Sequence, residues 1–415
     1  MENRLEKLLA KTPVSDQDRR LIQELVYGVV RWQSTLDWLI DRQLSRRPPA
    51  PEVRVLLRLG LYQLFWLDHI PDHAAVNETV ELAKQRRLSY QARFLNAVLR
   101  GYGREAAAAE RLLEDLKTRQ PSLGYSHPDW LCERWEQAFG RENLIALLRW
   151  NNTPPPTFAR LNALRSNSAS LAALWQAEGV SFTARTWDWT GDGLVFQLGS
   201  HPYLGALPSF RQGCFYVQDP STLLAVRELD PRPGETVLDF CAAPGGKTTF
   251  MAQLMQNRGQ IVALDNRVIR LELLKENCTR LGITCVNPIL APPQLPEPLG
   301  SRLFDKVLVD APCSNTGVMR RRVDLRWRLQ PSELSRLQNL QSTLLRQGAL
   351  HLKPGGTLVY STCSLEPEEN RRVVDAFLAK SPDYQLEMER QLLPFADGVD
   401  GAYTARIRRG QEREA

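Results

Sequence analysis

The sequence contains no C-x-x-C pair, and its five histidines are scattered without the spacing of metal ligands. Structural zinc sites use closely spaced cysteine and histidine side chains, so no metal centre is expected. The seven cysteines are odd in number, which argues against a disulfide framework. The chain also lacks an apolar run of the ~20 residues that span a bilayer, and residues 1–11 lack the apolar core of a signal peptide. We therefore expect a cytoplasmic protein with no membrane partner.

The composition is that of a folded globular protein, with 43% hydrophobic and 24% charged residues. A chain of 415 residues is longer than a domain with a single hydrophobic core ordinarily is. At ~150 residues per domain, this length predicts two or three domains. The formal net charge of +6 favours an anionic partner. Nucleic acid is preferred over a membrane, because lysine and arginine displace the counterions of a phosphate backbone.

The spacing of apolar residues divides the chain into three parts. Residues 1–120 carry helical periodicity and predict an all-helical domain, in which 106–117 read as a polar linker or spacer helix. Residues 121–232 mix one long helix with short alternating runs and predict a small α/β domain. Residues 233–415 alternate strands with helices, which predicts a Rossmann-like, doubly wound α/β domain with a parallel sheet. Its predicted strands are 236–240, 260–264, 304–310 and 357–361.

Two cysteines follow predicted strands of this last domain, in Asp310-Ala311-Pro312-Cys313-Ser314 and in Ser361-Thr362-Cys363-Ser364. The carboxyl ends of parallel strands meet at the edge of the sheet where ligands bind. A single free cysteine is most often a small buried hydrophobe. Two cysteines in the same setting instead favour a chemical role for both thiols.

The first turn of the domain, residues 241–248, permits two interpretations. Gly246-Lys247-Thr248 ends like a phosphate-binding loop, which would indicate a nucleoside triphosphatase. However, Cys241 replaces the leading glycine, and Pro244 removes an amide donor from the middle of the loop. A glycine-rich turn that approaches an adenosine-bearing ligand fits better, with Asp265 at the end of the second strand for the ribose hydroxyls.

Three motifs of this domain resemble the signature of the RNA cytosine carbon-5 methyltransferases, the NOL/NOP2/Sun family. They are Cys241 to Thr248, Asp310 to Ser314, and the Cys363 motif from Ser361 continued to Asn370. Their order and spacing are those of the family. The amino-terminal stretches 26–32 and 94–100 resemble a NusB-like helical domain. The resemblance therefore implies a NusB-like domain, a small α/β domain that binds RNA or links, and a Rossmann-like methyltransferase domain.

The resemblance also implies a reaction. Carbon 5 of cytosine is a poor nucleophile until a thiolate adds to carbon 6 and converts the ring to an enamine that can take a methyl group from S-adenosylmethionine. By the family pattern Cys363 is the nucleophile and Cys313 assists release of the product, with Asp310 near the ring or the cofactor. Residue types alone leave the two cysteine roles open, because both follow strands and DNA cytosine methyltransferases use a Pro-Cys nucleophile.

Similarity to the family likewise implies the binding site for S-adenosylmethionine. One departure concerns the adenine, because Ala291 stands where the family has an aspartate. A lost hydrogen bond of this kind weakens binding by about 0.5–1.5 kcal/mol if water substitutes. The cofactor-binding residues implied are Cys241, Ala242, Ala243, Pro244, Gly245, Gly246, Lys247, Asp265 and Asp310.

A basic segment after the Cys313 motif is the candidate for RNA contact. Blocks of like charge are often only solvated. Its likeness to an Arg-Arg-x-x-Asp-x-x-Trp stretch of the family favours RNA, since arginine grips phosphates and tryptophan stacks on bases. The residues concerned are Arg320, Arg321, Arg322, Arg326 and Trp327.

The substrate implied by the resemblance is 16S rRNA, with the cytosine at position 967 as the target and the enzyme acting as a monomer. Nothing in the residues themselves selects one cytosine, so another rRNA or tRNA site stays open. A NusB-like RNA-binding or transcription factor without catalysis is the alternative from another class.

Overall fold

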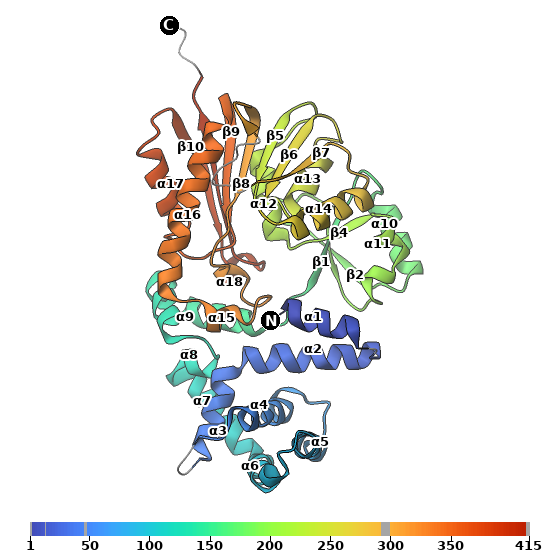
Figure 1. The fold of residues 1–415 in the computed structure, drawn as a ribbon, viewed down its shortest axis with the longest axis vertical. Coiled ribbons are helices and arrows are strands. Elements are labelled where there is room, and N and C mark those ends of the chain that lie inside the picture. Colours follow the sequence, from blue (N-terminus) through green and yellow to red (C-terminus); the bar gives the residue numbers. More distant parts are fainter. Residues whose placement is uncertain (1, 13, 45–47, 292–298, 412–415) are drawn as a thin grey trace. The chain divides into compact units, whose positions relative to one another are not determined.

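The computed structural model describes residues 2–12, 14–44, 48–291 and 299–411. The chain forms two compact units (Figure 1). The first contains residues 1–154 together with 319–328, and the second contains 155–318 together with 329–415. In the part of the chain that is described, no helix is long and apolar enough to cross a membrane.

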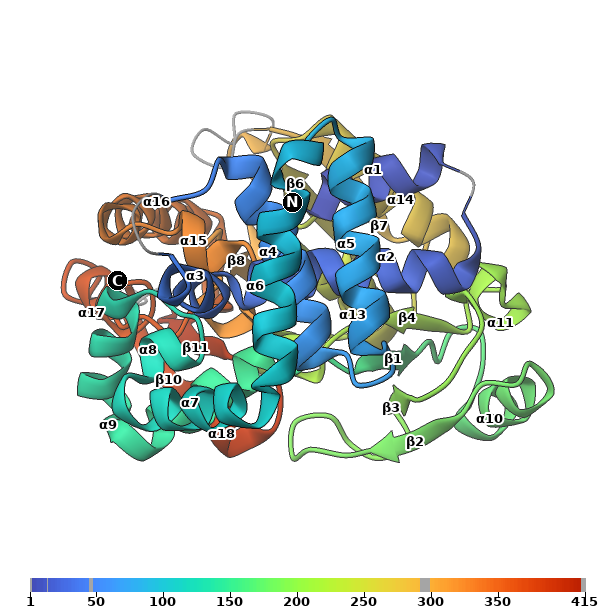
Figure 2. The same ribbon diagram turned by 90° about the horizontal axis from the view of Figure 1, so that it is seen from below.

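The first unit is helical, as the apolar spacing predicts. Ser15 caps the second helix by accepting a hydrogen bond from the Asp18 amide at 3.1 Å. Helices α4, α5 and α6 pack against one another (Figure 2). The α-helices are α1 (Glu2–Lys11), α2 (Asp16–Arg31), α3 (Gln33–Arg42), α4 (Pro51–Trp66), α5 (Asp72–Gln85), α6 (Ala92–Arg104), α7 (Ala106–Arg119), α8 (Pro121–Gly124), α9 (Asp129–Asn152) and α15 (Leu325–Arg328).

Helix α7 differs from the predicted linker or spacer helix. It buries Ala109, Leu113 and Leu116 inside the first unit. These positions are spaced by four and three residues and therefore share one helix face. The alanines and charged residues around them conceal this narrow apolar stripe, which explains why the segment reads as a polar helix that leads away from the core.

The second unit begins with a small antiparallel sheet in the order β2-β3-β1-β4. Trp175 is fully buried against the sheet, and its ring lies 5.1–5.3 Å from those of Phe182, Phe196 and Phe215. This aromatic core is what holds the short strands together. The elements are β1 (Thr157–Leu161), α10 (Ser168–Ala177), β2 (Phe182–Arg185), β3 (Val195–Leu198), α11 (Pro208–Arg211) and β4 (Phe215–Val217).

The large sheet has the order β10-β11-β9-β8-β5-β6-β7 among the residues described. The pairs from β9 to β7 are all parallel, which confirms the doubly wound domain. Its strands are β5 (Thr236–Phe240), β6 (Gln260–Asp265), β7 (Val286–Leu290), β8 (Phe304–Asp310), β9 (Leu352–Thr362), β10 (Tyr384–Leu392) and β11 (Ala402–Arg409). Its helices are α12 (Leu223–Leu229), α13 (Gly246–Leu254), α14 (Val268–Leu281), α16 (Pro331–Leu350), α17 (Arg371–Leu378) and α18 (Pro394–Asp397).

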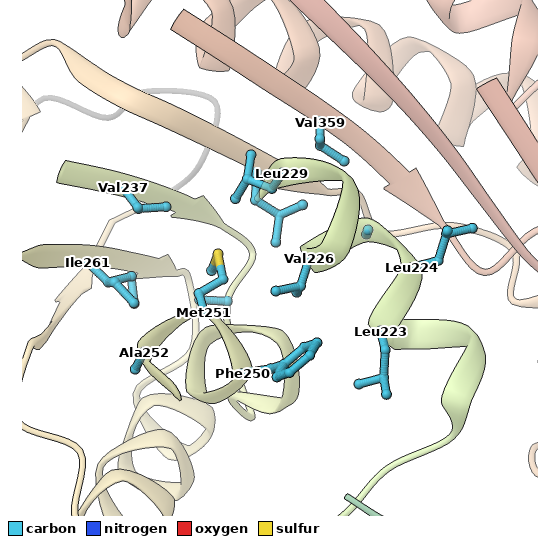
Figure 3. Packing of buried hydrophobic residues seen from close by; sticks show 14 of the residues in the cluster. Leu223, Leu224, Val226, Leu229, Val237, Phe250, Met251, Ala252, Ile261 and Val359 are labelled. Carbon is cyan, nitrogen blue, oxygen red and sulfur yellow. The ribbon is translucent and has the colours of Figure 1, made fainter. Parts of the chain in front are cut away.

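The sheet separates two hydrophobic cores, because alternate residues of each strand point to opposite faces. Val237 of β5 and Val359 of β9 pack with α12 and α13 on one face (Figure 3). Leu238 and Leu358, the neighbouring residues, pack with α16 and α17 on the other face. Burial on both faces explains why these strands read as continuous apolar runs.

The antiparallel strands β10 and β11 extend the sheet beyond β9 and are not among the predicted strands. Strand β9 is also longer than its predicted range, because it begins at Leu352 and runs through the Pro-Gly-Gly segment. An alternation of strands and helices predicts parallel neighbours only, so it gives no signal for an antiparallel edge.

Candidate active site

The predicted site residues of the second unit meet at the carboxyl edge of the large sheet. Strands β5, β6, β8 and β9 are parallel, so they all end at this edge. Strand β5 is followed in the chain by β6 on one side, while β8 lies on its other side. This arrangement is a topological switch point, and in open α/β sheets ligands bind in the crevice outside such a point.

The loop after β5 is shaped by backbone conformations that few residues adopt. Cys241 has φ 63° and Gly245 has φ 105°, both in the left-handed region. A Cβ atom at position 245 would lie 2.4 Å from Leu274 Cδ1, so only glycine fits there. Helix α13 begins at the next residue, Gly246, and the first amides of a helix have no acceptor within the helix.

Asp265, at the end of β6, is buried and holds the same loop. Its Oδ2 accepts the Ala243 amide at 3.3 Å, and its Oδ1 accepts the Arg267 amide at 3.0 Å. The guanidinium of Arg270 lies 3.4 Å from Oδ2 and also donates to the Ala243 carbonyl. The carboxylate is therefore fixed beside the turn.

Asp239, in strand β5 two residues before Cys241, is a second buried carboxylate. Thr248 Oγ1 donates to its Oδ2 at 2.6 Å, whereas its Oδ1 has no hydrogen-bond partner among the residues described. Burial raises the pKa of Asp239 to about 7. Burial also raises the pKa of the Cys241 thiol, and the charges of Asp310 and Asp265 add to the shift. Three carboxyl groups, those of Asp239, Asp265 and Asp310, therefore lie close enough to the loop to act on the Cys241 thiol.

The two predicted catalytic cysteines lie together, with their Sγ atoms 3.2 Å apart. Each belongs to a different loop, after β8 and after β9. The Cys363 amide donates to Cys313 Sγ at 3.3 Å, and Cys363 Sγ donates to Asn315 Oδ1 at 3.2 Å. The hydrogen bond with Cys363 raises the pKa of the Cys313 thiol well above its ordinary value, and burial and the charge of Glu369 act in the same direction.

Lys247 and Asp310 form a half-buried ion pair at the same edge, with Nζ 2.7 Å from Oδ2. Burial alone would lower the pKa of Lys247, but the charge of Asp310 and the hydrogen bond to it outweigh burial and raise the pKa. The ammonium group is thus directed to the end of β8, whereas in a phosphate-binding loop it would face a triphosphate.

Ala291, at the predicted adenine position, is buried after β7, and its amide donates to the Asp265 carbonyl at 3.2 Å. Its methyl side chain offers no acceptor to an adenine amine. The proline-rich continuation of this segment lies outside the described residues.

The basic segment predicted to contact RNA belongs to the first unit. Arg326 is 1% exposed. Its guanidinium donates to the carbonyls of Arg31, Ser126 and Asn151, each at 3.1 Å, and to Asn152 Oδ1 at 2.8 Å. These acceptors lie at or near helix ends, where carbonyl groups lack helical partners. In this structure Arg326 therefore links helices of the first unit through its hydrogen bonds.

The other members of this segment differ in exposure. Arg320 is 2% exposed and stacks over the Trp150 ring at 3.9 Å. Trp327 is half-buried and donates from Nε1 to the Val30 carbonyl at 2.7 Å. Arg321 is half-buried, whereas Arg322 is exposed.

Sequence reasoning did not identify several groups of the site. Asn315 accepts a hydrogen bond from the Cys363 thiol through Oδ1. Its φ is 62°, a conformation that asparagine tolerates better than most residues. Asp239, bonded to Thr248, and Glu369, bonded to Ser314, are two further buried carboxylates. Asn315 directly follows the Cys313 motif, Glu369 lies within the Cys363 motif and Asp239 stands two residues before Cys241, but buried partners distant in sequence cannot be read from spacing.

Comparison with known proteins agrees with this geometry. Residues 226–408 match the family model described as 16S rRNA methyltransferase RsmB/F, residues 1–104 match the NusB family, and residues 127–197 match an RsmF/B-like ferredoxin-like domain.

Individual relatives resemble the chain over nearly its whole length. The probable ribosomal RNA small subunit methyltransferase B of Bacillus subtilis is 36% identical, covering 98% of this chain and 94% of its own. The protein of the same name from Synechocystis is 40% identical, and the match covers 92% of this chain and 86% of the relative. Among solved structures, the crystal structure of PH0851 matches with a TM-score of 0.77 and 27% sequence identity. The match covers 95% of this chain and 90% of that chain. The chain belongs to the RsmB/F family of 16S rRNA methyltransferases.

Proposed function

We propose that the protein methylates carbon 5 of a cytosine in 16S rRNA through a covalent cysteine–cytosine adduct, with S-adenosylmethionine as the methyl donor. The observation that carries the proposal is the pair of thiols 3.2 Å apart in the loops after β8 and β9, two neighbouring strands of which β8 ends at Asp310. Family membership supports methylation of rRNA, and the names of the relatives support the small-subunit RNA as substrate.

The residues around the turn after β5 fit S-adenosylmethionine. The cofactor supplies a methyl group on a positively charged sulfur and carries an ammonium group. Carboxylates at Asp239, Asp265 and Asp310 suit such a cation, and the buried Asp239 Oδ1 is an acceptor without a partner among the described residues. The residues proposed to hold the cofactor are Cys241, Ala242, Ala243, Pro244, Gly245, Gly246, Lys247, Asp265 and Asp310. Ala291 leaves the adenine amine to water or to backbone.

The two thiols divide the chemistry. The thiolate of Cys363 adds to carbon 6 of cytosine, forming a carbon–sulfur bond while the ring nitrogen takes up a proton, and carbon 5 becomes nucleophilic. After carbon 5 is methylated, its proton must leave, and the carbon–sulfur bond breaks to restore the ring and free Cys363. The raised pKa of Cys313 keeps that thiol protonated, so it can give its proton to the departing Cys363 sulfur 3.2 Å away. The resulting Cys313 thiolate then takes the carbon-5 proton while the ring nitrogen loses the proton it gained.

Asp310 and the basic segment complete the proposal. The Asp310 carboxylate, held by Lys247, stabilises the protonated ring nitrogen in the adduct. Arg322 is exposed and can contact RNA phosphates, while Arg320, Arg321, Arg326 and Trp327 would contribute mainly by shaping the segment that carries it. We propose further that the enzyme acts as a cytoplasmic monomer and that its target is the cytosine at position 967.

The direct test is transfer of labelled methyl from S-adenosylmethionine to unmodified 16S rRNA, followed by digestion to nucleosides. We expect the label in 5-methylcytidine, at one position of the RNA. Label in another nucleoside would overturn the carbon-5 chemistry, and label in tRNA or at another cytosine would change the target. No transfer to any RNA would favour an RNA-binding factor without catalysis.

Asp265→Asn tests the cofactor site. We expect the affinity for S-adenosylmethionine to fall about 10-fold. The asparagine side chain has one acceptor oxygen where the carboxylate has two, and it carries no negative charge to attract the positively charged cofactor. Titration calorimetry measures the dissociation constant. Glu272→Gln removes an equal charge from the exposed face of α14 and should leave the affinity unchanged within about twofold. Equal affinities for wild type and Asp265→Asn would contradict the placement of the cofactor.

A further inference from the structure

Glu369 is a buried carboxylate to which the proposed reaction assigns no role. It is 0% exposed. Its Oε1 accepts the Ser314 amide at 2.8 Å and Gln341 Nε2 at 2.9 Å. Its Oε2 accepts the hydroxyls of Ser364, at 2.5 Å, and Ser314. Four donors converging on two oxygens suit an ionised carboxylate, because each oxygen has two acceptor positions.

The donors come from the two loops that carry the thiols. Ser314 directly follows Cys313, and Ser364 directly follows Cys363. The two serine hydroxyls lie 3.1 Å apart, so both loops reach the same carboxylate side by side. Gln341 of α16 adds a third element, since its Nε2 also donates to the Pro312 carbonyl at 3.0 Å.

We propose that the ionised Glu369 is the positioning residue that clamps the Ser314 and Ser364 loops together, so that the thiols of Cys313 and Cys363 face one position. The catalytic meaning of this clamp rests on the proposed function, whereas the clamp itself rests on the contacts of Glu369. A cytosine ring must meet the nucleophile and the release group in one geometry, and a displacement of ~1 Å can cost about 10²-fold in rate.

The clamp also makes the two thiols chemically different. The charge of Glu369 contributes to the raised pKa of Cys313, after the hydrogen bond with Cys363 and burial. Removing that charge should therefore lower the pKa of Cys313. The same carboxylate would thus fix where the thiols lie and keep Cys313 protonated.

The variant Glu369→Gln tests both effects, and Glu368→Gln is its matched control. Glu368 is the preceding residue, and its carboxylate pairs with exposed Arg372 at 3.1 Å. Using 16S rRNA, we expect kcat of Glu369→Gln to fall about 10- to 100-fold, while KM for RNA and the affinity for S-adenosylmethionine change by no more than about twofold. Glu368→Gln should behave as wild type.

Alkylation by iodoacetamide, followed over pH and assigned to each cysteine by peptide mass spectrometry, reports on the thiols without RNA or cofactor. We expect Cys313 of Glu369→Gln to react at lower pH than in wild type. Should Glu369→Gln fail to fold, Ser364→Ala must lower kcat in the same manner.

Three results would overturn the clamp: an unchanged alkylation profile, a kcat within about twofold of wild type, or a loss of cofactor affinity equal to the loss of kcat. Absence of methylation by the wild type would instead contradict the proposed function, and the alkylation profile would still decide on the clamp.

Discussion

The Cys363→Ala variant is expected to lose methyl transfer to RNA by about 10⁴-fold or more, as removal of a covalent nucleophile does in other enzymes. Without the thiolate, carbon 5 of cytosine never gains the electron density needed to attack a methyl group. The change removes one sulfur atom, whose hydrogen bond to Asn315 is replaced by water in a half-buried site. Affinities for RNA and for S-adenosylmethionine should therefore stay within about twofold of wild type.

The measurement combines labelled methyl transfer with filter binding of 16S rRNA. Cys285→Ala is the matched control, because Cys285 precedes β7 at the opposite end of the sheet and is likewise half-buried. It should retain full activity. Methylation that survives Cys363→Ala would reject Cys363 as the nucleophile, and a parallel loss of RNA affinity would indicate a binding role instead.

Of the five parallel strands in the described residues, β5, β6, β8 and β9 could be predicted because their signals are local, whereas β7 was not predicted. Strands β5, β6 and β8 are buried on both faces, and each appears in the sequence as a short apolar run before a turn. The carboxyl edge then follows from parallel pairing alone. This is why Asp265, Asp310 and the two cysteines could be expected to converge without knowledge of any contact.

The antiparallel edge was missed although its sequence alternates. Tyr384, Leu386 and Met388 recur at every second position of β10, with charged or amide residues between them. That pattern indicates a half-buried strand. It gives no information on the partner, and the pairing of β10 with β11 and of β11 with β9 depends on register between distant segments.

The position of Arg326 could not be predicted for a related reason. A run of arginines is ordinarily solvated, because burying a cation is costly unless hydrogen bonds replace its water. Those bonds come from carbonyls 175 to 295 residues away in sequence. Glu369 presents the same problem, since Ser314 lies 55 residues before it and only the fold brings them together.

The Cys313→Ala variant is expected to accumulate a covalent enzyme–RNA adduct and to lose about 10²- to 10⁴-fold in turnover, the range that a proton-transfer group contributes. Cys363 can still add to the ring, but the thiol that lies 3.2 Å from it and takes part in release is gone. A denaturing gel of labelled 16S rRNA with the enzyme would show the adduct as a band of reduced mobility. The double variant Cys313→Ala/Cys363→Ala should give no band, because no nucleophile remains. A band with Cys363→Ala, and none with Cys313→Ala, would exchange the two roles.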